Sequence, residues 1–124
     1  MPWKVERNSE LGAIELRFTG RINRVEIWDS TAEALSIASG PGRHLFLSDF
    51  SDATLELSAL DIYNIPDQWE AAGAERKNRV AVVTPQDSVN FEDSKFYENV
   101  TTNRGWNVRV FEDRESAIEW LKKD

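Results

Sequence analysis

The side chains best suited to chemistry follow two short apolar runs of the sequence. Asp49 and Asp52 follow the run 44–48, and Asp87 follows the run 80–83. If these runs are neighbouring parallel strands, their carboxyl ends meet at one sheet edge, where α/β proteins commonly bind ligands. Carboxylates there would suit Mg²⁺ and phosphoryl chemistry. Asp and Ser are also the ordinary residues of turns and helix caps, and this second interpretation needs no metal.

Nucleophilic catalysis and zinc binding lack the residues that they need. The chain has one histidine, His44, and no cysteine. A Ser-His-Asp arrangement would require His44, which we expect at the opposite end of a strand from Asp49. The sequence contains no glycine-rich phosphate loop and no Gly-x-Ser-x-Gly motif;. We therefore predict a protein that is not an enzyme and needs no metal or cofactor, with an acid-dependent hydrolase using Asp49 as the outside alternative.

Two further polar residues stand at predicted helix ends. Ser58 opens Ser-Ala-Leu-Asp, a spacing typical of a capped helix start;. Arg104 follows another predicted helix, and its guanidinium is suited to clamping a carboxylate or phosphate bidentately. The alternative is that Arg104 complements the negative end of that helix or pairs with Glu98 or Glu112.

Composition indicates one globular domain spanning residues 1–124. The hydrophobic fraction is 40% and the charged fraction 30%, and this length is enough to bury a core. With 22 acidic and 15 basic side chains the formal charge is −7, which disfavours nucleic acid or an anionic membrane surface as partner. No apolar run approaches the roughly 18 residues of a membrane span. Because residues 1–6 lack a secretory-signal pattern, we expect a cytoplasmic protein.

The first part of the chain predicts a hairpin and a helix. Residues 3–7 and 13–18 alternate apolar and polar side chains, as antiparallel strands with one solvated face do, and Gly20 is expected to end the second strand;. Asn23 and Glu26 have the spacing of a capping box. The face of the following helix that packs on the sheet is expected to comprise Val25, Trp28, Ala32, Leu35 and Ala38;.

The middle of the chain predicts the central strand of the sheet. Residues 44–49 form a short apolar run that suits a strand buried on both faces, and 50–53 is expected to be the polar turn after it;. A helix then starts at Ser58. Because Pro66 has no amide hydrogen to donate, this helix is expected to be kinked or divided into two at that point.

The last part of the chain predicts two more strand–helix pairs. Runs 80–83 and 108–111 indicate short strands, and apolar residues from Phe91 to Val100 mark a helix between them;. Asn103–Gly105 suits the end of that helix, and Asp113 suits the start of a final one. The order β-β-α-β-α-β-α-β-α predicts an α/β fold with a mixed, mostly parallel sheet in a single domain.

This order, the capped helix after the central strand, and the ending Asn103–Phe111 with Ala117–Leu121 resemble the SpoIIAA-like group of bacterial STAS domains. The resemblance covers nearly the whole chain and rests mostly on core and cap residues, so it bears on fold more than on activity. It implies a non-enzymatic regulatory module, similar to anti-sigma-factor antagonists and to the cytosolic domains of sulfate transporters.

The resemblance also implies a candidate modification site. In the antagonists, a serine within an Asp-Ser-Ser-Gly pattern at the start of this helix is phosphorylated by the partner kinase, and the matching stretch here is Glu56-Leu57-Ser58-Ala59. The Asp and Gly are missing, and helix capping alone is a sufficient reason for Ser58. We expect the partner-binding face to comprise residues 50–57 and the helix from Ser58. The candidate residues for partner binding or phosphorylation are Ser58, Asp49 and Asp52.

A second function stays open, because the SpoIIAA-like group also resembles the CRAL-TRIO lipid-carrier fold. Aromatic residues on two neighbouring helices would hold a small apolar or lipid-like ligand if those helices move apart. The ligand-binding candidates are Tyr63, Trp69, Phe96 and Tyr97, with Phe91 nearby and Arg104 for a charged group. A homodimer is also open, because a free hairpin edge or an aromatic helix face invites self-pairing.

Overall fold

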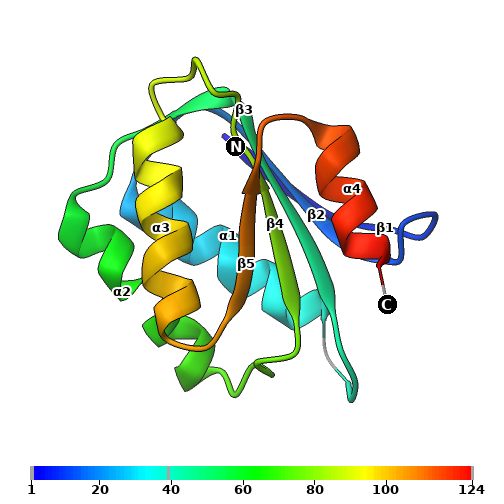
Figure 1. Ribbon diagram of the computed structural model, residues 1–124. Helices are drawn as coiled ribbons and strands as arrows, with labels where there is room; N and C mark the ends of the chain where they lie inside the picture. Colours follow the sequence, from blue (N-terminus) through cyan, green and yellow to red (C-terminus); the bar gives the residue numbers. More distant parts are fainter. Residues whose placement is uncertain (1, 39, 124) are drawn as a thin grey trace.

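The computed structural model describes residues 2–38 and 40–123. Within these residues, five strands and four helices follow in the predicted order (Figure 1). The elements are β1 (Trp3–Asn8), β2 (Ala13–Ile22), α1 (Arg24–Ile37), β3 (Leu45–Leu55), α2 (Ala59–Ala71), β4 (Arg79–Val83), α3 (Phe91–Asn103), β5 (Asn107–Phe111) and α4 (Arg114–Lys122).

The strands lie side by side in the order β1-β2-β3-β4-β5. β1 and β2 form the predicted antiparallel hairpin, and each later pair is parallel. Right-handed crossovers that always advance in one direction leave their helices on the same side of the sheet. Accordingly α1, α2 and α3 cover one face, and α4, which follows the last strand, lies on the other (Figure 1).

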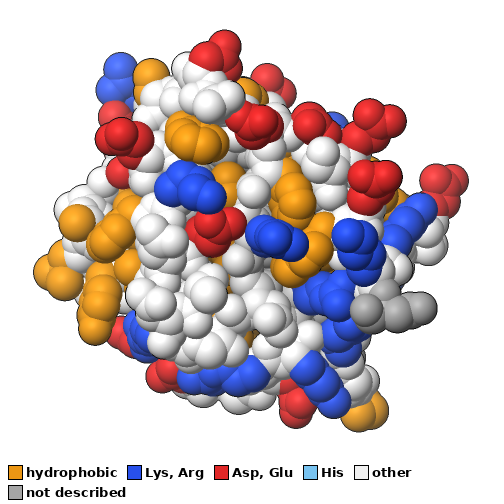
Figure 2. All heavy atoms as spheres, viewed as in Figure 1, with side chains coloured by type: hydrophobic (Ala, Val, Ile, Leu, Met, Phe, Trp, Pro, Cys, Tyr) orange, Lys and Arg blue, Asp and Glu red, His pale blue; other side chains and the backbone are white. Residues whose placement is uncertain are grey.

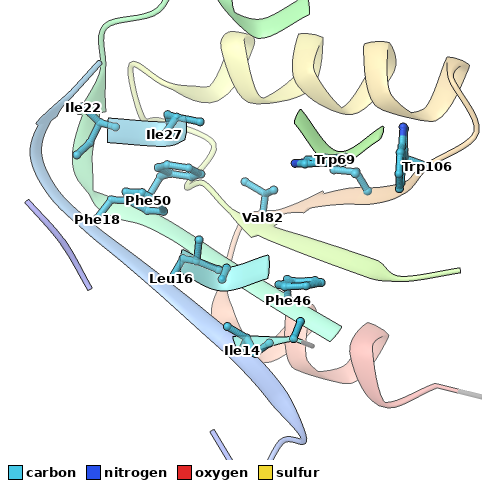
Figure 3. Packing of buried hydrophobic residues seen from close by; sticks show 13 residues of the cluster. Ile14, Leu16, Phe18, Ile22, Ile27, Phe46, Phe50, Trp69, Val82 and Trp106 are labelled. Carbon is cyan, nitrogen blue, oxygen red and sulfur yellow. The ribbon is translucent and has the colours of Figure 1, made fainter. Parts of the chain in front are cut away.

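The sheet separates two apolar clusters. The larger one lies under α1, α2 and α3, and Figure 3 shows Phe18 beside Phe50 and Trp69 beside Trp106 in it. The ring centroids of the first pair are 4.4 Å apart, and those of the second are 5.1 Å apart with the rings edge to face. The smaller cluster joins strand residues to Ala117 and Leu121 of α4. Burial on both faces explains why the start of β3, Leu45–Leu47, and β4 after Arg79 contain only apolar side chains;.

The central strand is longer than the sequence indicates. Residues 50–53, predicted as a turn, continue β3, and β2 runs past Gly20 to Ile22. The β2–β3 ladder shifts register between Arg17 and Thr19 and then resumes with Thr19 opposite Asp52. Polar residues fit this extension because Phe50, Ala53 and Leu55 face the large cluster while the residues between them are exposed;.

The buried face of α1 also differs from the predicted one. Ile27, Ser30 and Ala34 point to the sheet. Of the predicted face, Leu35 and Ala38 pack in the large cluster as expected, whereas Val25, Trp28 and Ala32 are exposed. At 100° per residue the observed face is rotated by roughly a third of a turn from the predicted one. The helix sequence has two apolar stripes. The stripe that is buried contains Ser30, so it is less apolar in sequence than the predicted one.

The helix ends are as the sequence predicts. Capping boxes join Asn23 to Glu26 and Ser58 to Asp61, and Asp113 accepts a hydrogen bond from the Ser116 amide. Pro66, by contrast, does not divide α2, which is a single helix around it. Pro66 cannot donate the backbone hydrogen bond of its turn. Ile62 before it and Trp69 after it are both buried, and their packing keeps the helix continuous.

None of the helices in the described part of the chain is long and apolar enough to cross a membrane.

Candidate functional site

An open groove of about 550 Å³ lies between α1 and α2. Residues of the first two turns of α1, Leu57 before the cap of α2, and residues 61–67 of α2 line this α1–α2 groove. Its apolar lining residues are Val25, Ile27, Trp28, Leu57 and Ile65, and its polar ones are Arg24, Asp29, Asp61, Asn64 and Asp67. Ile27 is buried while Val25 and Trp28 are open to solvent, so the apolar lining reaches the surface.

Exposed hydrophobic side chains extend from the groove along the outer side of α2. Val25 is 55% exposed, Trp28 46%, Leu60 67% and Tyr63 53%; these four residues are the apolar patch. Leu60 and Asn64 are one turn apart, so the patch continues around α2 from the groove wall. Figure 2 shows hydrophobic side chains gathered at the left of the molecule, where Figure 1 places α2.

Gln68 joins the two helices below the groove. Its amide nitrogen donates to the carbonyl of Trp28 at 2.8 Å, and the side chain is buried. Its amide oxygen is buried with no hydrogen-bond partner in the described residues. A buried donor–acceptor pair with fixed geometry sets the spacing of α1 and α2, and therefore the width of the groove.

Arg104 holds α2 from its other side. Its guanidinium bonds Asp67 at 2.6 Å and the carbonyl of Tyr63 at 3.1 Å, and it reaches Glu70 at 3.4 Å. The hydrogen bond that Arg104 donates to the Asp67 carboxylate is the main reason why the pKa of Arg104 is raised. The alternative prediction, that Arg104 pairs with Glu98 or Glu112, is wrong, because its partners are Asp67 and Glu70. Glu98 bonds Lys95 and the Val110 amide. Arg104 therefore clamps carboxylates of its own chain, one of which, Asp67, lines the groove.

Sequence comparison gives no relatives, since no family model and no curated protein matches the chain. Among solved structures, the chain is similar to an uncharacterised protein of the DUF3478 family from Shewanella loihica PV-4, whose fold is described as SpoIIAA-like. The TM-score is 0.62 with 18% sequence identity, over 96% of this chain and 91% of that chain. The chain has a SpoIIAA-like fold. The predicted fold class is thereby confirmed, and at this identity the likeness concerns the fold.

In this SpoIIAA-like fold, Ser58 stands at the exposed start of α2, beside the groove. Its hydroxyl accepts from the amide of Asp61 at 3.1 Å, and the Asp61 carboxylate accepts from the amide of Ser58 at 2.9 Å. The capping role is thus confirmed. Phosphorylation of Ser58 stays a prediction.

The three acids singled out in the sequence are separated by the SpoIIAA-like fold. Asp49 lies on the α4 side of β3, where its carboxylate accepts from the amide of Ser51. Asp52 is exposed further along β3, and Asp87 is exposed in the loop after β4. Over residues 2–38 and 40–123, no three acidic or histidine side chains are grouped so as to hold a metal.

The ligand candidates divide into two groups. Trp69 and Tyr97 line an internal cavity of about 60 Å³ between the sheet and the helices. Tyr97 also lines a second one of about 50 Å³, and burial raises the pKa of its hydroxyl. Tyr63 and Phe96 instead face solvent, and Arg104 lines neither cavity. The aromatic residues of α2 and α3 therefore do not form one site: Trp69 and Tyr97 face the sheet, and Tyr63 and Phe96 face solvent.

A buried charge on the α4 side of the sheet was missed by sequence reasoning. Glu15 accepts hydrogen bonds from Arg114 and Asn8, both at 2.6 Å, and Arg17 lies 3.4 Å away. Burial alone would raise the pKa of Glu15, but these donors and the positive charges outweigh it and lower the pKa. The only signal in the sequence was an acid at an alternating position of a strand, which indicated a solvated face.

Proposed function

We propose that this protein is a non-enzymatic regulatory module that binds a protein partner through the α1–α2 groove and the apolar patch. The exposure of Trp28 is the observation that carries the proposal. Contiguous apolar surface beside a groove is characteristic of interaction sites, and tryptophan and tyrosine are frequent anchors of interfaces. Leu60 and Tyr63 enlarge that surface, and the clamps at Gln68 and Arg104 hold its two helices in place.

The proposed face keeps only part of the one expected from sequence. The helix from Ser58 remains in it. Residues 50–55, expected as part of a binding loop, belong to β3, and 52–55 are paired with β2. The second half of the proposed face therefore comes from α1 instead. His44 precedes β3, and its ring contacts the carbonyl of Gly40 at 3.1 Å.

Trp28→Ser is expected to weaken binding of the natural partner by at least about 30-fold, the loss typical of a central aromatic anchor. The measurement is co-purification of the tagged protein from its own source, followed by titration with the partner that is recovered. Because Trp28 is half exposed, the variant should keep the melting temperature of the wild type.

Val89→Ser is the matched control. Val89 is 79% exposed but lies in the segment before α3 and does not line the groove. Partner affinity should be unchanged in this variant. Equal affinity of the Trp28 variant and the wild type would contradict the proposed face.

We propose binding of a small apolar ligand as a second candidate function, favoured by the two internal cavities. They share the wall residues Leu16, Thr31, Ser48 and Tyr97, so one molecule with an apolar body and a hydrogen-bonding group would span both. Each cavity has room for only a few water-sized groups. A lipid-sized ligand therefore requires α1, α2 and α3 to move away from the sheet.

Native mass spectrometry of gently purified protein tests the second candidate. We expect an additional mass of metabolite size on the wild type that is lost in Ser48→Phe, because the new ring fills the shared wall. Phe96→Ala, which changes an exposed ring of α3, should retain the additional mass. An apo mass for the wild type would remove this function without affecting the groove.

A further inference from the structure

We infer that the segment docked in the α1–α2 groove is a basic amphipathic α-helix of another protein. The inference rests on the proposed function and adds the chemistry of the partner to it. Three properties of the groove lead to this choice: its walls are helices, its floor is apolar, and carboxylates outnumber cations around it.

The backbone of the groove walls disfavours an extended peptide. Apart from the break in the ladder at Pro66, the main-chain groups in the interior of an α-helix bond within that helix, so α1 and α2 offer no free main-chain ladder;. A strand laid over Ile27, Leu57 and Ile65 would leave its own amides unpaired against apolar side chains. A helix bonds its amides internally and presents only side chains, which is how helices bind in grooves of this kind.

The charge around the groove favours a basic partner. Asp29, Asp61 and Asp67 line it, against one cation, Arg24. Asp61 belongs to the cap of α2 and Asp67 is paired with Arg104. Asp29 is exposed and makes no hydrogen bond or ion pair with any residue that the structure describes, and the chain as a whole carries −7. Lysine or arginine beside the apolar face of the partner helix would complement these carboxylates.

The same charges argue against a second copy of this chain as the occupant. A two-fold contact through the apolar patch would bring identical surfaces together. Asp29 and Asp61 of one copy would then face the same carboxylates of the other, which opposes association. The patch is hydrophobic enough for a partner, but its rim selects one of opposite charge.

Selection from a displayed library of random peptides of about 16 residues, roughly four helical turns, tests the inference. The full-length wild type is the bait, and peptides that also bind Trp28→Ser are removed. The two baits have the same charge, so general attraction of basic peptides to an acidic protein is subtracted. We expect the surviving peptides to have net positive charge and apolar residues at i, i+3 or i+4, and i+7.

A synthetic peptide from that pool provides the quantitative test. Its affinity should fall at least about tenfold in Asp29→Lys and fall with rising salt, and it should stay unchanged in Val89→Ser. Its helicity should increase on binding, as measured by circular dichroism.

The outcomes separate the two levels of the proposal. Groove-dependent peptides that are acidic, or that alternate apolar residues with period two, would overturn the partner class and leave the docking face standing. Failure to enrich any Trp28-dependent peptide would overturn the partner class, while the natural-partner titration with Trp28→Ser decides the docking face independently. A dimer of the wild type that is lost in Trp28→Ser, seen by sedimentation, would identify a second copy as the occupant and overturn the inference.

Discussion

Arg114→Ala is expected to lower the free energy of unfolding by about 2–3 kcal/mol at neutral pH, because it leaves a buried carboxylate without its main partner. The side chain of Glu15 is 5% exposed, and its shortest contacts are those with Arg114 and Asn8. Removal of one partner of a buried ion pair usually has a larger effect. Here Asn8 and Arg17 remain in contact with Glu15. Urea unfolding at pH 7 measures the difference.

The pH dependence of this variant identifies the cause. In the wild type the pKa of Glu15 is lowered, so its contribution to stability is present above the pH at which the unfolded carboxyl titrates. That contribution is lost as the pH falls through the folded-state pKa. Without Arg114, burial is expected to outweigh the remaining donors and raise the pKa of Glu15. The destabilisation of the variant should therefore be full at pH 7. It should shrink as the pH falls through the raised pKa of Glu15 in the variant and then through the lowered pKa in the wild type;.

Arg109→Ala is the control for this experiment. Arg109 is an exposed arginine on β5, and its loss removes the same charge from the protein without uncovering Glu15. Its stability should follow the wild type at every pH. A destabilisation of Arg114→Ala that does not depend on pH would indicate lost packing of α4 rather than an unpaired carboxylate.

Asn90→Ala is expected to destabilise the protein by about 2–4 kcal/mol, because it leaves two backbone groups of β3 without partners. Asn90 is 1% exposed. Its amide oxygen accepts from the amide of Leu55, and its amide nitrogen donates to the carbonyl of Ala53, both at 2.8 Å. The Asn90 side chain thus pairs with backbone groups at the end of β3, as the backbone of a neighbouring strand would.

This effect should also reach the groove. β3 ends at Leu55, two residues before Leu57 of the groove lining. Amide hydrogen exchange at Leu55 should become faster in Asn90→Ala, and affinity for the partner should fall with it. Asn99→Ala, at an exposed asparagine of α3, is the control and should change neither. Unaltered exchange at Leu55 would show that the loss of stability arises elsewhere.

The order of elements was predictable because its signals are local. The cap residues Asn23, Ser58 and Asp113 and the short apolar runs act within a few residues of chain, and each was found where the sequence indicates;. The continuity of α2 through Pro66 was less predictable. The intrinsic preference of proline against a helix interior competes with the burial of Ile62 and Trp69 on either side, and burial prevails.

The candidate site was predictable only in part. Ser58 and the start of α2 were identified, but Trp28 was assigned to the core. Which apolar stripe of α1 is buried depends on how β2 and β3 present their side chains beneath it, and spacing within the helix cannot contain that information. Asp49 and Asp52 were predicted to gather with Asp87 at one sheet edge, and the fold separates them. The positions of the two acids on β3 depend on the register shift beside Arg17, which the sequence does not indicate.

The sequence by itself determined the α/β class, the order of strands and helices, the helix caps and the acidic charge, since these depend on residues close together in the chain or on composition. Only the tertiary structure decided which residues far apart in the sequence come into contact. Arg114 with Glu15, Gln68 with the carbonyl of Trp28, and Asn90 with the end of β3 are contacts of this kind. The physical reason is that a polar side chain has many potential partners in a sequence, and packing of the apolar faces selects which of them come within hydrogen-bond distance.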